Sequence, residues 1–229
     1  MPSAEKILYF LPSALLNVIG VAILGYGISA EWASSTMDCS PADTNWFNGT
    51  ATIQMGLFAG TELKDSCPRF TTSEKPIAVF DSMSAVGGAG IGLHAVVVVL
   101  LVFALVASAG SIFITLYNTI TNPYETCMGP IGLYVCSGLS ACLAFLAMVL
   151  YLINLLGVNI GKKILLSNLN GVLMDETVTF LVGFFMILPY ITVNLLAILL
   201  VYLYAHAAYR QRQEQQKPTE DAPKEILMY

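Results

Sequence analysis

Residues 89–117 read AGIGLHAVVVVLLVFALVASAGSIFITLY, a run without a single charged side chain. A helix needs about 20 apolar residues to cross the hydrocarbon core of a membrane, which is about 30 Å thick. Inside lipid every backbone amide must be paired within its own segment, so this run is predicted to be a membrane-spanning helix. It is too long and too continuous for a barrel strand, in which apolar residues alternate over about 10 residues.

Three further stretches of the chain also lack charge. They lie between Lys6 and Glu31, between Glu125 and Lys162, and between Glu176 and Arg210. The four predicted spans are residues 7–29, 89–117, 129–156 and 177–205. Only 11% of all residues are charged, against about 25% in a soluble domain. The sequence therefore predicts a four-span integral membrane protein. The first span is interpreted as a retained anchor, because it is longer than the apolar core of a signal peptide.

The orientation rests on the loop of residues 30–88. Lys and Arg are only weakly biased to one side. This loop, however, carries the sequon Asn48-Gly49-Thr50 and the pair Cys39 and Cys67, and glycosylation and disulfides belong outside the cytoplasm. We expect a Cys39–Cys67 bridge, although a sequon also arises by chance. Loops 30–88 and 157–176 are then extracellular. Residues 1–6, 118–128 and 206–229 are cytoplasmic, and the plasma membrane is the expected location.

The first loop contains two short apolar runs, residues 51–58 and 77–80, with turn formers such as Pro68 between them. This pattern predicts a small antiparallel sheet. A two-stranded hairpin is marginal by itself, so the disulfide and the helix ends are expected to support it. The second loop fits two interpretations, a helix that continues above the membrane or a cap on the sheet.

Polar and small residues interrupt the spans. The polar ones are Asn17, His94, Asn154 and Asn194. They fit ligand contacts or a proton path, but interhelical hydrogen bonds explain them better, because no ionisable partner lies beside His94. Gly88 and Gly92 have the spacing of close helix packing, within one chain or in a dimer. Pro189 is expected to kink the fourth helix.

Motifs of catalysis and metal binding are not found. The two histidines, His94 and His206, exclude H-E-x-x-H, the cysteines lack C-x-x-C spacing, and G-x-S-x-G does not occur. Asp and Glu never lie within a span, which argues against an ion-coupled transporter. No basic patch indicates nucleic acid. We expect no enzymatic activity, no cofactor, no metal and no small-molecule substrate.

Two features on the predicted cytoplasmic side are candidate contacts. Residues 206–217 are predicted to continue the fourth helix. Leu227 and Tyr229 occupy the third-last and last positions, the pattern of a segment that adds a strand to a PDZ domain. Cys127, beside the membrane, is a palmitoylation candidate. In each case an unbound or unmodified residue is the alternative.

Three stretches resemble the clarins, small four-span glycoproteins of the wider claudin and peripheral-myelin-protein group. Residues 55–60, MGLFAG, resemble a clarin first-loop motif carried by Gly56, Leu57 and Phe58. Trp32 is placed like the tryptophan that ends the first span in the wider group. Residues 116–124, LYNTITNPY, followed by GPIG, resemble the clarin loop between spans two and three. The tail, residues 209–215, resembles the third branch of the family.

The resemblance implies a left-handed four-helix bundle beneath an extracellular antiparallel sheet, and a membrane organiser rather than an enzyme. A claudin has Trp at the position of Phe58 and two closely spaced cysteines after it. Here Cys39 precedes the motif and Cys67 follows it, which argues against tight-junction strands.

Three functions fit these observations. The first is a structural or adaptor protein, in the lipid bilayer, that binds membrane or scaffold proteins through its helix faces, first loop and tail. The second is an auxiliary subunit of an ion channel or receptor. The third is a claudin-like paracellular barrier or pore. First-loop charges of both signs are typical of a solvated surface rather than of a pore lining; they are Glu62, Lys64, Asp65, Arg69, Glu74 and Lys75.

Overall fold

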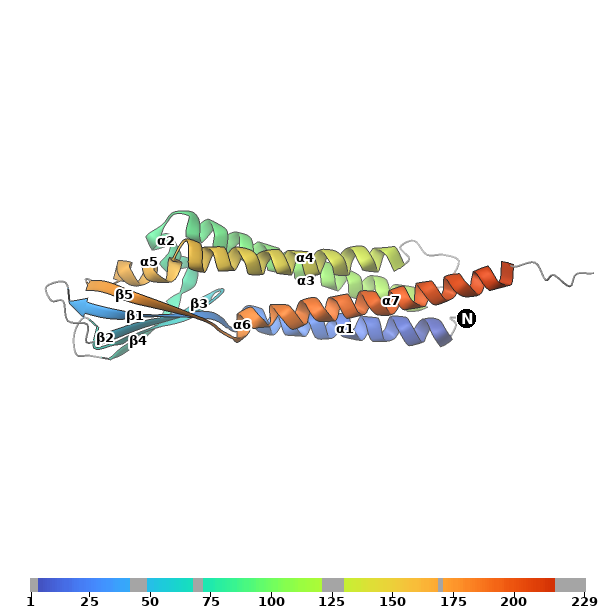
Figure 1. Ribbon diagram of the computed structural model, residues 1–229, viewed down its shortest axis with the longest axis horizontal. Coiled ribbons are helices and arrows are strands. Elements are labelled where there is room, and N and C mark those ends of the chain that lie inside the picture. The colour runs from blue at the N-terminus through green and yellow to red at the C-terminus, as the bar shows by residue number, and fades with distance from the viewer. Residues whose placement is uncertain (1–3, 42–48, 68–71, 121–129, 169–170, 217–229) are drawn as a thin grey trace, which may run out of the picture.

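The computed structural model describes residues 4–41, 49–67, 72–120, 130–168 and 171–216. Long helices lie side by side, and a sheet lies at one end of them (Figure 1). The start of the first helix and the end of the last lie at the opposite end. The molecule therefore consists of a helical bundle with a β-sheet at one end.

The bundle is formed by α1 (Ala4–Ser29), α3 (Ala89–Ile120), α4 (Pro130–Leu152) and α7 (Ile187–Gln216). Helix α1 packs against α3 and α7, and α4 packs against the same two helices. Four helical stretches in the described residues are long and apolar enough to cross a membrane. The predicted four-span membrane fold is confirmed. Many leucine, valine and phenylalanine side chains on these helices are exposed, as expected of a surface that faces lipid.

The sheet contains β1 (Glu31–Pro41), β2 (Gly49–Gly56), β3 (Ala59–Asp65), β4 (Ser73–Ala78) and β5 (Gly171–Phe180). All neighbours are antiparallel, in the order β4-β3-β2-β1-β5. The predicted small antiparallel sheet is confirmed, but it has more strands than the two apolar runs indicate. Residues 57–58 form the turn between β2 and β3. Residues 79–80 begin helix α2 (Val79–Val86) instead of ending a strand.

The second loop contributes both a helix and a strand. A π-helical turn, η1 (Ile153–Gly157), follows α4 and leads into α5 (Ile160–Asn168). Strand β5 then pairs with β1 at the edge of the sheet. The prediction of helix over residues 177–180 is wrong, because Val178 and Phe180 are paired with β1.

The fourth span starts after β5, with α6 (Val182–Phe185) and then α7. The helix is interrupted at Met186, three residues before Pro189. This is the expected effect of Pro189, which cannot donate to the carbonyl of Phe185 and crowds the preceding turn.

One face of the sheet is buried and the other is polar. In β2 the buried residues Ala51, Ile53 and Met55 alternate with the more exposed Thr50, Thr52 and Gln54, as expected when one face is covered. Helix α5 covers this face with Ile164 and Leu165, both fully buried. On the opposite face the hydroxyls of Thr36 and Thr52 lie 3.1 Å apart.

Candidate functional site at the junction of sheet and bundle

The turn between β2 and β3 reaches back onto the helices. Its Leu57 carbonyl accepts a hydrogen bond from His94 Nε2 of α3, at 2.8 Å, and its Phe58 carbonyl accepts one from Val79 N of α2, at 2.9 Å. Leu57 and His94 are both buried. The turn is therefore fastened to two helices through its backbone, and His94 serves as a structural donor.

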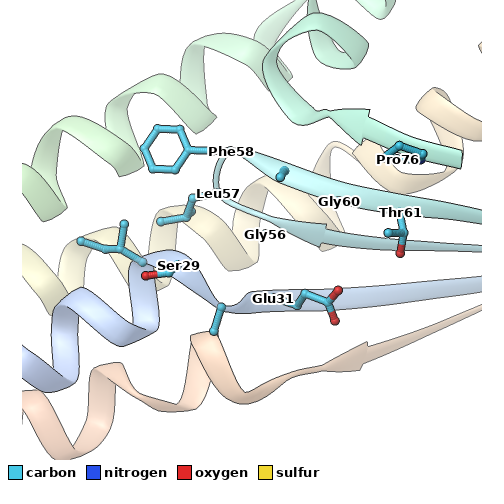
Figure 2. A pocket seen from close by; sticks show the side chains of 11 residues that line it. Ser29, Glu31, Gly56, Leu57, Phe58, Gly60, Thr61 and Pro76 are labelled. Carbon is cyan, nitrogen blue, oxygen red and sulfur yellow. The ribbon is translucent and has the colours of Figure 1, made fainter.

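Gly56 is required by a close approach of backbone to backbone. A Cβ atom at this position would lie 2.9 Å from the carbonyl oxygen of Ala59 and 3.1 Å from that of Ala30. By contrast, Phe58 points away from the turn toward α3 (Figure 2) and is 52% exposed. Of the three residues, Gly56 thus has no room for a side chain, Leu57 is buried, and Phe58 points outward.

Trp32 occupies the other side of the junction. Its Nε1 donates a hydrogen bond to the Gly27 carbonyl of α1, at 2.7 Å, and its ring is fully buried. The ring meets Tyr151 of α4 edge-on, with 4.9 Å between centroids. A Cβ atom at Gly183 of α6 would lie 2.5 Å from the Trp32 ring. Trp32 therefore joins three elements and depends on a glycine in the third.

Comparison with known proteins places the whole chain in a family. The chain is 33% identical to Clarin-3 of Mus musculus over 237 residues and 34% identical to Clarin-3 of Rattus norvegicus over 230 residues. It is 30% identical to Clarin-3 of Homo sapiens over 235 residues, and in each case 100% of both chains is covered. The chain belongs to the clarin family. No protein-family model matches it, and the names of these clarins state no activity or ligand.

The buried polar residues of this clarin link its spans to one another. Ser137 of α4 donates to Asn17 Oδ1 of α1, at 3.4 Å, and Ser140 of α4 donates to Asn194 Oδ1 of α7, at 3.0 Å. Asn154 Nδ2 donates to the Gly90 carbonyl of α3, at 3.1 Å. These contacts support the interpretation of these polar residues as interhelical hydrogen-bonding groups.

The close helix packing predicted from the spacing of Gly88 and Gly92 is not seen within the described residues. A Cβ atom at Gly92 would meet nothing within 4 Å, and Gly88 lies before the helix with a φ of 80°. Neither glycine therefore makes a close helix contact with any residue that the structure describes.

A disulfide joins Cys39 on β1 to Cys67 after β3, as the even pair in one loop predicts. Their Cα atoms are 5.7 Å apart, and both side chains are buried. The bridge lies at the end of the sheet that is remote from Trp32. The other predicted sites, Asn48, Cys127, Leu227 and Tyr229, lie outside the described residues.

Two carboxylates in the sheet are less exposed to solvent than the sequence indicates. Glu62, expected on a solvated surface, is only 3% exposed and forms an ion pair with Lys64, at 3.0 Å. Burial raises the pKa of the Glu176 carboxyl, while the nearby Lys162 ammonium and Ser35 hydroxyl act in the opposite direction.

Within the described ranges, no group of three or more His, Cys, Asp or Glu residues is placed to hold a metal ion.

Glu176 reaches this position through a bulge in β5. Thr36 pairs with Thr177 and Asp38 pairs with Met174, so Met37 lies opposite both Asp175 and Glu176. Asp175 takes a φ of 53°, which Asp tolerates better than most residues. A bulge has no simple sequence signal, so the partly buried Glu176 carboxylate was not predicted.

Proposed function

We propose that this clarin is a non-enzymatic structural or adaptor protein of the plasma membrane, with both termini in the cytoplasm and the sheet outside the cell. The proposal places function in surfaces rather than in a reactive centre. It includes the predicted roles of the helix faces, of loop 30–88 and of the tail, residues 206–229.

The observation that carries the proposal is the internal use of the family motif. Leu57 and Trp32 bind His94 and Gly27 through hydrogen bonds, and neither side chain is exposed. These contacts hold the sheet against the bundle at two separate points. Such a junction suits a protein that presents a fixed surface to partners, since it limits the movement of the sheet relative to the helical bundle.

The edges of the sheet favour its face as the contact surface. Edge strand β4 contains Pro76, which cannot donate to a further strand, and edge strand β5 carries the bulge at Asp175. Both are devices that discourage strand addition. The open face instead presents hydroxyl groups, among them those of Thr36 and Thr52, and α7 extends past the candidate span that ends at Arg210.

The charge distribution gives less support to a paracellular pore. The Glu62 carboxylate is buried against Lys64, so this pair adds no free charge to a pore lining. A role as an auxiliary subunit of an ion channel or receptor is compatible with the same surfaces. It differs from the adaptor role because the protein would then bind one partner in a fixed stoichiometry.

The test is proximity labelling in intact cells with the full chain and with a chain that lacks residues 227–229. A matched control lacks residues 219–221. We expect partners to be lost only when the terminal residues are removed; an unchanged set would remove the tail from the proposal. Stoichiometric copurification with one channel would favour the auxiliary subunit, and aggregation of expressing cells would favour the barrier.

The orientation is tested by an epitope tag inserted after Asn48. We expect antibody staining of intact cells. Staining that requires permeabilisation would overturn the proposed orientation, without affecting the assignment to the family.

A further inference from the structure

A hollow of about 440 Å³ lies where the first span meets the sheet. It is bounded by the end of α1, the start of β1 and the turn between β2 and β3 (Figure 2). The lining includes Ile28, Ser29, Glu31, Leu57, Phe58 and Thr61.

The depth of the hollow in the membrane follows from the end of the first span. The apolar helical stretch of α1 ends at Ser29, and Ser29 itself lines the hollow. Outside the hydrocarbon core, the headgroup zone is about 5–7 Å deep on each side. The hollow therefore lies where lipid chains give way to headgroups, on the side of the membrane that holds the sheet.

The lining is apolar on one side and polar on the other. Ile28, Leu57 and Phe58 supply the apolar part. Figure 2 shows Phe58 directed toward α3, whereas Glu31 and Thr61 lie along the strands. This division matches a molecule with an apolar body and a polar end, arranged in the same direction as a lipid of that leaflet.

The polar part carries negative charge. Glu31 is the single ionisable residue of the lining, it is exposed, and it forms no ion pair with any residue that the structure describes. The hydroxyl of Ser29 donates to the Gly25 carbonyl, at 2.7 Å, so it presents an acceptor to the hollow. A carboxylate and an acceptor oxygen attract an ammonium group and repel an anionic headgroup.

We propose that the hollow binds a zwitterionic phospholipid from the leaflet on the sheet side. Its ammonium group lies against the Glu31 carboxylate, and its chains leave past Ile28 and Phe58 along the lipid-facing helices. This inference does not depend on the proposed adaptor role. It assigns a ligand to the junction itself, next to the family motif.

The test is native mass spectrometry of the purified full chain in detergent, titrated with phosphatidylcholine or phosphatidylglycerol. Glu31→Gln removes the charge and keeps the size, and Glu74→Gln is the control at an exposed acid of β4 outside the lining. We expect wild type to prefer phosphatidylcholine. Glu31→Gln should weaken that binding by about fivefold, the loss of a favourable exposed ion pair, and Glu74→Gln should leave it unchanged.

Three results would overturn the proposal. They are equal affinity of Glu31→Gln and Glu74→Gln for phosphatidylcholine, equal affinity of wild type for the two lipids, and displacement of phosphatidylcholine by an equal concentration of soluble phosphocholine. Should Glu31→Gln lose the Cys39–Cys67 bridge or its thermal transition, Thr61→Phe replaces it. That variant fills the hollow and keeps the charge, and the proposal requires it to lose phosphatidylcholine as well.

Discussion

His94 in the second span and Leu57 at the tip of the β2–β3 turn are joined by a hydrogen bond of 2.8 Å between Nε2 and the carbonyl oxygen. The two residues are 37 positions apart in the sequence. Neither group has access to water, since both residues are buried. The imidazole of His94 thus helps to fix the position of the β2–β3 turn relative to the helices, together with the hydrogen bond from Val79 N to the Phe58 carbonyl.

Replacing His94 with Phe should destabilise the protein, because the buried Leu57 carbonyl would lose its donor. The expected loss in free energy of unfolding is about 1–3 kcal/mol. Thermal unfolding in lipid nanodiscs measures it. His206→Phe is the control, since His206 lies exposed on α7 and should leave the transition unchanged. Equal transitions for both variants would contradict the structural role of His94.

Two glycine-to-alanine variants should behave in opposite ways. Gly183→Ala places a Cβ atom 2.5 Å from the Trp32 ring and 2.7 Å from the Glu31 carbonyl oxygen, which should cost about 1–3 kcal/mol through overpacking. Gly138→Ala meets nothing within 4 Å and should be neutral or slightly stabilising in its helix. The measurement is the thermal transition of each detergent-purified variant compared with wild type. A Gly183→Ala protein with the wild-type transition would contradict the tight fit around Trp32.

Loss of the disulfide should weaken the sheet without removing the bundle. Cys39→Ser opens a bridge between residues 28 positions apart, at an expected cost of about 2–4 kcal/mol. Limited proteolysis of the sheet strands, compared with that of the spans, measures the local effect. The control is Cys142→Ser, which changes a free and exposed cysteine. Equal protection of the sheet in both variants would show that the bridge contributes little.

The stability of the protein should depend on pH through Glu176. Burial raises the pKa of this carboxyl in the folded protein above its ordinary value of 4.5, so the folded state holds the proton more tightly than the unfolded chain does. The stability that this group contributes is complete below pH 4.5 and is lost as pH rises through the folded pKa. Glu176→Gln should remove this decline in thermal transitions measured from pH 4 to pH 8 in about one-unit steps.

The comparison that tests this pH effect is with Glu74→Gln, at an exposed position on β4. That variant should keep the wild-type decline. A Glu176→Gln protein with the same pH profile as wild type would show that the carboxyl is not perturbed by its burial.

The sequence predicts the spans well because lipid imposes a single physical requirement on them. The apolar run from Ala89 continues as one helix to Ile120, and the absence of charge is visible directly in the residues. The same rule misassigns residues 177–180, since Val178 and Phe180 are apolar for a different reason. They pair with β1 in the sheet, and no charge marks the change from strand to helix.

The candidate site is less accessible to prediction, because its contacts are made by backbone atoms. Resemblance singles out Gly56 and Trp32, but neither residue type indicates a partner. The bond from His94 ends on the Leu57 carbonyl, and any residue supplies a carbonyl. The sequence does not predict the buried Glu62–Lys64 ion pair either, since charged residues in a loop are expected to face water.

The connections between sheet and helices have a mechanical consequence. Helix α1 ends at Ser29 and β1 begins at Glu31, whereas β5 ends at Phe180 and α6 begins at Val182. β1 pairs with β5, and α1 packs against α7. The paired strands therefore continue directly from the two packed helices across the membrane surface. Helices tilt when the bilayer becomes thinner, and such a tilt would swing the sheet through the same angle.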